Sequence, residues 1–235
     1  MARIFKEKFK TLNDVFDEFT IRNLFKLEGQ GYFEELESAI AIGKEANVFI
    51  ARKKDGTRII VKIYRLSTCD YHQMLKHLQE DKRFQGIKKS KRQIIFAWAQ
   101  REYRNLLKSR ELRVNSPTPI HCYYNIVLME QIGEEEIAQK LGVNYPKKPE
   151  EFLKKTIENI KKLYKGGMVH GDLSSFNILN NNETPVLIDF SQSTTTDNPH
   201  AKEYLKRDIK NTLNTFKKRG VKIDEKEVYD EVVGR

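Results

Sequence analysis

Three polar side chains of the kind that bind Mg²⁺ and move protons lie around one predicted β-hairpin. Short apolar runs within residues 178–188 flank a turn-rich segment at 180–185, the pattern of two strands joined by a tight turn. Asn177 just precedes the first strand and Asp189 just follows the second, so strand pairing brings both to one open end. Asp172 lies in the loop that leads in. The sequence therefore predicts two oxygen ligands for Mg²⁺ beside a carboxylate that can act as a base.

Taken singly, each of these residues fits a polar strand end or a solvated loop position. Their joint spacing argues against that interpretation. The preceding His170-Gly171-Asp172 resembles the catalytic segment of the protein-kinase-like fold, in which ordinary kinases carry His-Arg-Asp. More narrowly, residues 173–179 and 188–192 resemble the RIO family of atypical kinases.

This resemblance covers most of the chain, roughly residues 11–220, with the motifs in the same order. Residues 43–48 and 98–106 are similar to the phosphate loop and to helix C of the RIO1 branch. The resemblance points to the short, archaeal-type form of that branch.

A strand, a tight loop and a second strand are predicted at residues 39–51. Small residues in the loop let a backbone fold closely over phosphates. With one glycine, the pattern alone favours an ordinary hairpin turn. The resemblance implies that the loop contacts ATP through Gly43, Lys44, Glu45, Ala46, Asn47 and Val48.

A second set of elements predicts a buried ion pair between Lys62 and Glu102. In the strand predicted at 58–64, Lys62 lies on the face opposite three isoleucine and valine side chains. In the helix predicted at 91–108, Glu102 falls within the apolar stripe, where a lone carboxylate is costly. The alternatives are a solvated lysine and an edge glutamate that reaches water. Pairing explains both positions, and it would orient Lys62 towards the α- and β-phosphates.

The hinge and a flexible loop are assigned from the resemblance. It implies that the backbone at Glu130 and Ile132 hydrogen-bonds adenine and that Met129 gates the pocket behind it. The sequence alone indicates a core strand with a flexible exit. The resemblance also implies a flexible loop at residues 66–90, in which Ser90 is the candidate autophosphorylation site; a solvated loop is the alternative.

Further helices are expected at residues 11–27, where Thr11 and Asp14 resemble a capping box, at 33–38, at 149–165 and at 221–235. Asn198 is expected to cap one more helix, with Pro199 at its first position. Asp208 lies on the apolar stripe of that helix and suggests a paired charge.

Composition restricts the class of protein. The 235 residues suffice for one large domain or two small lobes, and 39% hydrophobic residues suffice for a core. A net charge of +10 suits an anionic partner such as ATP, nucleic acid or an acidic protein, but also a solvated basic surface.

Cys69 and Cys122 fit reduced thiols. No signal peptide or membrane helix is apparent, so a cytoplasmic protein without a membrane partner is expected.

The short stretch between Phe190 and Asp197 leaves no room for a long activation segment. Gly171 stands where an arginine would clamp a phosphorylated activation loop, so control by that route is not expected. The predicted fold is α+β and two-lobed, of the protein-kinase type. Residues 1–132 form an N-terminal lobe with an antiparallel sheet and helix C, and residues 133–235 form a mainly helical C-terminal lobe.

The resemblance implies an ATP-dependent serine/threonine kinase or ATPase of RIO1 type, with Mg²⁺ or, alternatively, Mn²⁺. Asn177 and Asp189 would bind the metal, Asp172 would accept the proton of the attacking hydroxyl, and Asp189 could also act as a nucleophile. The family's role implies maturation of the small ribosomal subunit, with the pre-ribosomal subunit, its rRNA or its proteins as partners. Two alternatives are a small-molecule phosphotransferase of aminoglycoside-kinase type and a non-catalytic assembly factor switched by ATP. The oligomeric state is left open.

Overall fold

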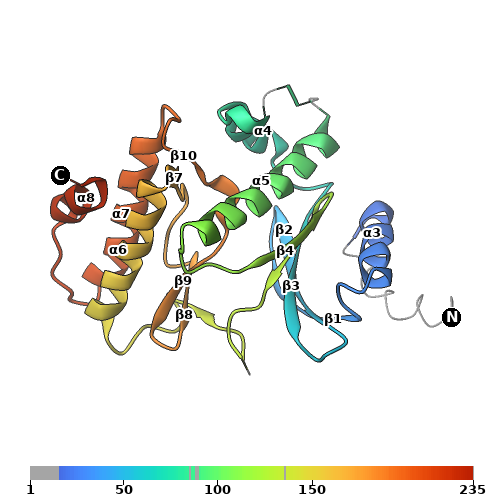
Figure 1. Cartoon of the computed structure of the whole chain (residues 1–235), viewed down its shortest axis with the longest axis horizontal. Helices are drawn as coiled ribbons and strands as arrows, with labels where there is room; N and C mark the ends of the chain where they lie inside the picture. The colour runs from blue at the N-terminus through green and yellow to red at the C-terminus, as the bar shows by residue number, and fades with distance from the viewer. Residues whose placement is uncertain (1–15, 85, 88–89, 135, 235) are drawn as a thin grey trace.

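The structure, a computed structural model, describes residues 16–234 except 85, 88, 89 and 135. An antiparallel sheet in the order β1-β2-β3-β5-β4 lies on one side of the molecule, and α6, α7 and α8 lie on the other (Figure 1). The helices are α3 Glu18–Gly29, α4 Tyr71–Gln79, α5 Lys91–Glu111, α6 Pro149–Lys165, α7 Ala201–Lys217 and α8 Glu225–Val233. The strands of the sheet are β1 Glu35–Ile42, β2 Ala46–Arg52, β3 Arg58–Tyr64, β4 Pro119–Tyr123 and β5 Ile126–Glu130. The shorter elements are η1 Lys82–Phe84, β6 Gln139–Lys140, β7 Met168–Val169, β8 Ile178–Asn181, β9 Thr184–Leu187, η2 Phe190–Gln192 and β10 Thr194–Thr195.

Both faces of the sheet are covered, by α3 on one side and α5 on the other (Figure 1). Leu24 and Leu27 of α3 pack in one buried cluster with Val61 of β3. Trp98 of α5 packs in a second cluster with Ile60 of the same strand. The alternation predicted for β3 is therefore confirmed, and it turns Lys62 towards α5.

Among the described residues, α3 accounts for the N-terminal helix predicted at 11–27. α3 starts at Glu18, and the Asp17 carboxylate caps it by accepting a hydrogen bond from the Thr20 N–H at 3.0 Å. The capping box expected at Thr11 and Asp14 lies outside the described residues.

The helical turns expected at residues 33–38 are wrong, because most of this segment belongs to β1, which pairs with β2. Arg52 of β2 forms salt bridges across the two strands, to Glu35 at 2.7 Å and Glu37 at 3.3 Å. Cross-strand pairing thus outweighs the local pattern.

The segment 66–90 contains a helix where a flexible loop was expected. The Asp70 carboxylate caps α4, and Met74 and Leu78 are buried in the cluster that contains α5. Ser90 is the N-cap of α5. Its role as an autophosphorylation site stays a prediction.

The C-terminal helices pack around aromatic side chains. The ring centroids of Phe152 on α6 and Phe216 on α7 lie 6.3 Å apart, and Val232 of α8 is fully buried in the same cluster. α6 has the predicted bounds, and α8 is shorter than the helix predicted at 221–235, because residues 221–224 are not helical. The division expected between residues 132 and 133 stays a prediction.

The start of α7 differs from expectation. The helix begins at Ala201 with His200 as its N-cap. Asn198 instead accepts a hydrogen bond from the His200 N–H at 2.8 Å and donates one to Thr194, so it stabilises the preceding turn. Pro199 therefore lies before the helix.

The β8–β9 hairpin is confirmed, with Ile178 opposite Leu187. Its turn is tighter than the predicted segment 180–185, because only Asn182 and Glu183 link the strands, with φ of 49° and 63°. Two such residues give the type of turn that suits a two-residue hairpin.

Candidate active site

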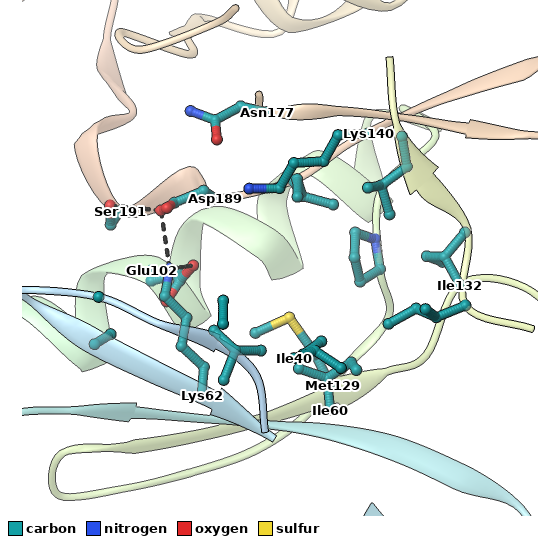
Figure 2. A pocket seen from close by; sticks show the side chains of 18 of the residues that line it. Ile40, Ile60, Lys62, Glu102, Met129, Ile132, Lys140, Asn177, Asp189 and Ser191 are labelled. Atoms are coloured by element: carbon teal, nitrogen blue, oxygen red, sulfur yellow. Dashed lines mark hydrogen bonds and ion pairs between the residues drawn. The ribbon is translucent and has the colours of Figure 1, made fainter. Parts of the chain in front are cut away.

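A cavity of about 660 Å³ lies where the sheet, α5 and the β8–β9 hairpin meet (Figure 2). The predicted site residues that line it are Gly43, Lys44, Glu45, Ala46, Val48, Lys62, Glu102, Met129, Glu130, Ile132, Asn177 and Asp189. Of the others, Asn47 is fully buried in β2 and Ser90 caps α5. Asp172 lies in the loop beside Asn177.

Lys62 joins the two halves of the site (Figure 2). Its Nζ lies 2.7 Å from Glu102 Oε1 on α5 and 2.9 Å from Asp189 Oδ1 beyond β9, so the predicted Lys62–Glu102 pair forms. Burial alone would lower the pKa of Lys62, but the two carboxylates outweigh it and raise the pKa. The ammonium has three donors, so one remains for a ligand. The Tyr64 hydroxyl donates to the other Glu102 oxygen at 2.6 Å, a contact absent from the sequence argument.

The environment of Asp189 keeps its carboxylate ionised. Burial opposes ionisation, but the Lys62 ammonium and hydrogen bonds from Lys62 and Ser191 lower the pKa of Asp189 to about 2. Both of those donors bind Oδ1. Asp189 has φ 63°, a conformation that costs a non-glycine residue about 1–3 kcal/mol and is typical of functional sites.

Asn177 is oriented for a cation. Its Nδ2 donates to the Asp172 backbone carbonyl at 2.8 Å and to Asp172 Oδ2 at 3.1 Å, which leaves the amide oxygen for a ligand. In Figure 2 this oxygen is on the Asp189 side. The Ile188 N–H donates to the Asn177 carbonyl at 3.0 Å and closes the hairpin, as the sequence predicted.

These residues fit Mg²⁺ held jointly with phosphates. Within the described parts of the chain, no three acidic, histidine or cysteine side chains converge as a self-sufficient metal centre would require. Mg²⁺ is commonly held by one or two protein oxygens together with phosphate oxygens. Asn177 and Asp189 could provide those two oxygens.

The environment of Asp172 favours the protonated carboxyl group. Burial, and then the nearby charge of Asp189, raise the pKa of Asp172. A raised pKa makes the carboxylate a better proton acceptor near neutral pH. The amide of Asn177 fixes its orientation.

Asp208 of α7 supports the loop at residues 170–177, which the sequence predicts to be the catalytic loop, but not as the paired charge that was expected. Its oxygens accept the Gly171 N–H at 2.7 Å and the Leu173 N–H at 2.8 Å. Burial raises the pKa of Asp208 to about 7, against the opposing effect of those two bonds. The polar residue in an apolar stripe was the correct signal, but its partners are backbone amides, which periodicity does not reveal.

Gly171 is required by a close approach of two backbones. It has φ 83°, and a Cβ there would lie 2.8 Å from the Gln192 carbonyl oxygen. The segment of Gln192 is held on α5, since Asn105 donates to the Phe190 and Ser193 carbonyls and Arg101 donates to Ser193. No side chain fits at position 171 while this segment stays in place.

We expect Gly171→Ala to lower the free energy of unfolding by about 1–3 kcal/mol and to reduce phosphotransfer, because it adds both backbone strain and a steric clash. Urea unfolding measures the first effect. Gly220→Ala is the matched control, since Gly220 has φ 89° but nothing lies within 4 Å of a Cβ there. An equal loss in the two variants would contradict the role of the Gln192 contact.

His170 orients the catalytic loop in its neutral form. Its Nε2 lies 3.1 Å from the Ile188 carbonyl, so Nε2 carries the proton and Nδ1 accepts the Asp172 N–H at 3.4 Å. Burial lowers the pKa of His170 to about 4.

Stability is therefore expected to fall as the pH is lowered from about 6.5 towards about 4. The pKa of His170 is lower in the folded chain than in the unfolded chain, so the unfolded chain takes up a proton first as the pH falls. Protonation therefore favours the unfolded chain, and stability that is present at neutral pH is lost. This pKa shift of His170 corresponds to roughly 3 kcal/mol in the free energy of unfolding. Urea unfolding across this range should show a smaller loss for His170→Gln than for the wild type. Equal losses would show that other groups cause the pH dependence.

The side of the cavity at which the sequence predicts adenine is formed by the end of β5 and the residues that follow it. The Glu130 N–H donates to the Thr118 carbonyl at 2.9 Å and is therefore not available to a base. Met129 and Ile132 line the cavity beside it. Hydrogen bonding to adenine stays a prediction.

Lys140 is the lining residue that the sequence argument missed most clearly. β6 places it opposite Leu179 of β8, and its side chain extends into the cavity (Figure 2). Lys140 forms no salt bridge with any described residue. A single lysine in a two-residue strand carries no sequence signal.

A family model of the RIO domain matches residues 47–228. The chain is 41% identical over 235 residues to the RIO-type serine/threonine-protein kinase Rio1 of Methanocaldococcus jannaschii, covering 99% of this chain and 80% of that protein. It is 34% identical over 229 residues to the protein of the same name from Haloferax volcanii, covering 97% of this chain and 79% of that protein. No helix in the described residues is long and apolar enough to cross a membrane.

The fold is similar to two crystal structures of Rio2 kinase from Chaetomium thermophilum, both 22% identical. One, an ADP/Mg²⁺-phosphoaspartate complex, has a TM-score of 0.67 and covers 88% of this chain and 64% of that one. The other has a TM-score of 0.69 and covers 88% of this chain and 66% of that one. The present chain thus spans about two thirds of the length of those chains. This likeness confirms the predicted two-lobed, kinase-like α+β fold.

Proposed function

The chain belongs to the RIO1 branch of the RIO family of serine/threonine-protein kinases, and on that premise we propose that it transfers the γ-phosphate of ATP through the cavity beside Lys62. The observation that carries the proposal is the pair of contacts from Lys62 to Glu102 and to Asp189. One lysine thereby links the sheet, α5 and the end of the hairpin.

In the proposed mechanism, the remaining donor of Lys62 binds a phosphate oxygen. Asn177 and Asp189 would hold Mg²⁺, which neutralises charge on the phosphates. Asp172 accepts the proton of the serine or threonine hydroxyl as that oxygen attacks the γ-phosphorus. The bond to ADP breaks and ADP leaves.

The enzyme would also act as an ATPase through Asp189. Lys62 and Ser191 bind Oδ1 of Asp189, whereas Oδ2 has no such donor in the described residues and can attack the γ-phosphorus. ADP leaves, and water then hydrolyses the aspartyl phosphate. The phosphoaspartate in the Rio2 complex supports this proposal.

The test is ATP turnover with and without pre-ribosomal small subunits, followed by identification of the labelled protein. Phosphoserine or phosphothreonine in an added protein supports the kinase. A hydroxylamine-sensitive label lost in Asp189→Asn supports the aspartyl phosphate. An absence of turnover under both conditions would contradict both activities and favour a non-catalytic binding factor switched by ATP.

The pre-ribosomal small subunit, its rRNA or its proteins are the partners we propose, in the cytoplasm. The net charge of +10 supports an rRNA-rich partner, and the free thiols of Cys69 and Cys122 suit a reducing compartment. Co-purification of small-subunit RNA with the tagged protein would test the partner.

Lys140 is expected to contribute to binding the phosphates, because two carboxylates already engage Lys62. Lys140→Ala should weaken ATP binding about fivefold to tenfold, ADP binding less, and adenosine binding not at all. Titration calorimetry with the three ligands measures this. Lys154→Ala, which removes an exposed lysine of α6, should change none of them. Equal weakening for all three ligands would indicate a packing role for Lys140.

A further inference from the structure

A second hollow, of about 480 Å³, lies beside the catalytic loop and has no role in the mechanism above. Its polar lining comes from two parts of the chain: Ser174 and Ser175 of the loop, and Asn211, Asn214, Thr215, Lys218 and Arg219 of α7 and its C-terminal end. We call this the basic hollow. We propose that it binds an anionic side chain, a carboxylate or a phosphate, of the protein substrate close to the acceptor hydroxyl. This inference rests on the proposed function, because it assumes that the hydroxyl that accepts the phosphate belongs to a protein.

The lining suits an oxyanion. Lysine and arginine donate charge-assisted hydrogen bonds, and serine and asparagine donate neutral ones. No carboxylate lines the basic hollow, and neither Lys218 nor Arg219 forms a salt bridge with a described residue. The Arg219 guanidinium lies 4.4 Å from the centroid of the Tyr145 ring, which helps to hold it in place. Its charge is therefore not neutralised from within the described residues.

The basic hollow is close to the proposed base. Ser174 is two residues after Asp172, so their Cα atoms are at most about 7 Å apart, the span of two extended residues. The Ser174 carbonyl accepts the Asn177 N–H at 2.9 Å, which fixes this part of the loop. The wall of the basic hollow that Ser174 forms therefore lies within the span of two or three extended residues from the proposed base.

Neither the helix dipole nor an RNA phosphate accounts for the basic hollow as well as a peptide does. Basic residues at a helix C-terminus interact favourably with the helix dipole, but that does not explain why loop hydroxyls share the same hollow. An RNA phosphate has the required charge, but the hollow adjoins the site where a protein hydroxyl is expected to react. A peptide is therefore the occupant that the position favours.

The test uses the full chain and short fluorescent peptides in which alanine replaces the acceptor serine. A residue two or three positions away is aspartate, phosphoserine or asparagine, and fluorescence anisotropy gives each Kd. We expect the aspartate and phosphoserine peptides to bind more tightly than the asparagine peptide. Lys218→Ala and Arg219→Ala should each weaken binding of the anionic peptides about tenfold and leave the asparagine peptide unchanged.

Lys154→Ala is the matched control, since it removes one exposed charge from α6, away from the basic hollow. Lys218 and Arg219 are exposed, so their variants should unfold at the wild-type urea concentration. Lys218→Glu should reverse the preference towards a lysine-containing peptide. With serine restored, Lys218→Ala should raise KM for the aspartate peptide and leave kcat unchanged.

Equal affinity for the three peptides, or equal effects of Lys218→Ala and Lys154→Ala, would overturn the proposal. Short single-stranded RNA that binds in a Lys218-dependent manner, while the anionic peptides do not, would assign the hollow to RNA and overturn it as well. Because the anisotropy assay needs no phosphotransfer, failure of this site is distinguishable from failure of the proposed kinase activity.

Discussion

Asp172→Asn is expected to lower the rate of phosphotransfer by about 10²–10⁴-fold while Kd for ATP changes by less than about twofold. The substitution removes the proton acceptor but keeps an oxygen that can accept the hydrogen bond from Asn177 Nδ2. Asp172 does not line the ATP cavity, so the binding contacts remain. Single-turnover transfer of labelled phosphate measures the rate, and titration with an ATP analogue measures the affinity.

Asp230→Asn is a matched control for the loss of one negative charge, because Asp230 lies on α8, away from the cavity. This variant should behave as the wild type. Wild-type activity of Asp172→Asn would exclude Asp172 as the base, and a large loss of ATP affinity would mean that Asp172 contributes to binding instead.

Glu102→Ala is expected to lower the free energy of unfolding by about 3 kcal/mol, and to weaken ATP binding as well. Glu102 is 1% exposed, and its removal leaves the Lys62 ammonium with Asp189 alone. It also removes the oxygen that accepts the hydrogen bond of the buried Tyr64 hydroxyl at 2.6 Å, and the loss of a buried acceptor is costly. Urea unfolding gives the stability, provided that the m-value is unchanged.

Glu102→Gln separates charge from packing in this prediction. Glutamine keeps the size of the side chain and an oxygen for Tyr64, so the loss of stability should be smaller than for alanine. A fall of less than about 1 kcal/mol for Glu102→Ala would mean that Asp189 suffices to compensate the charge of Lys62.

The parts of the site that sequence predicts are those set by regular spacing. Hairpin pairing places Asn177 and Asp189 at one end, and the alternation of β3 together with the stripe of α5 brings Lys62 to Glu102. These geometries repeat every two or about 3.6 residues, so position in the chain predicts position in space.

The incorrect or missing assignments depend on contacts between distant segments. The stretch in which β1 begins locally resembles a helix. It nevertheless forms a strand, because pairing with β2 determines its conformation. Asp208 binds amides of a loop 35 and 37 residues away in the sequence. Lys140 enters the cavity only because β6 joins β8. No local pattern reports such pairings, so they required the structure.

The close packing of Gly171 against Gln192 also limits how this protein can evolve. A single substitution that restored arginine at position 171 would meet both an unfavourable φ and a backbone oxygen 2.8 Å from its Cβ. Acquiring an arginine that senses a phosphorylated activation loop would therefore require the segment held by Asn105 to be rebuilt first. An ancestral chain with this packing had no one-step route to that kind of regulation.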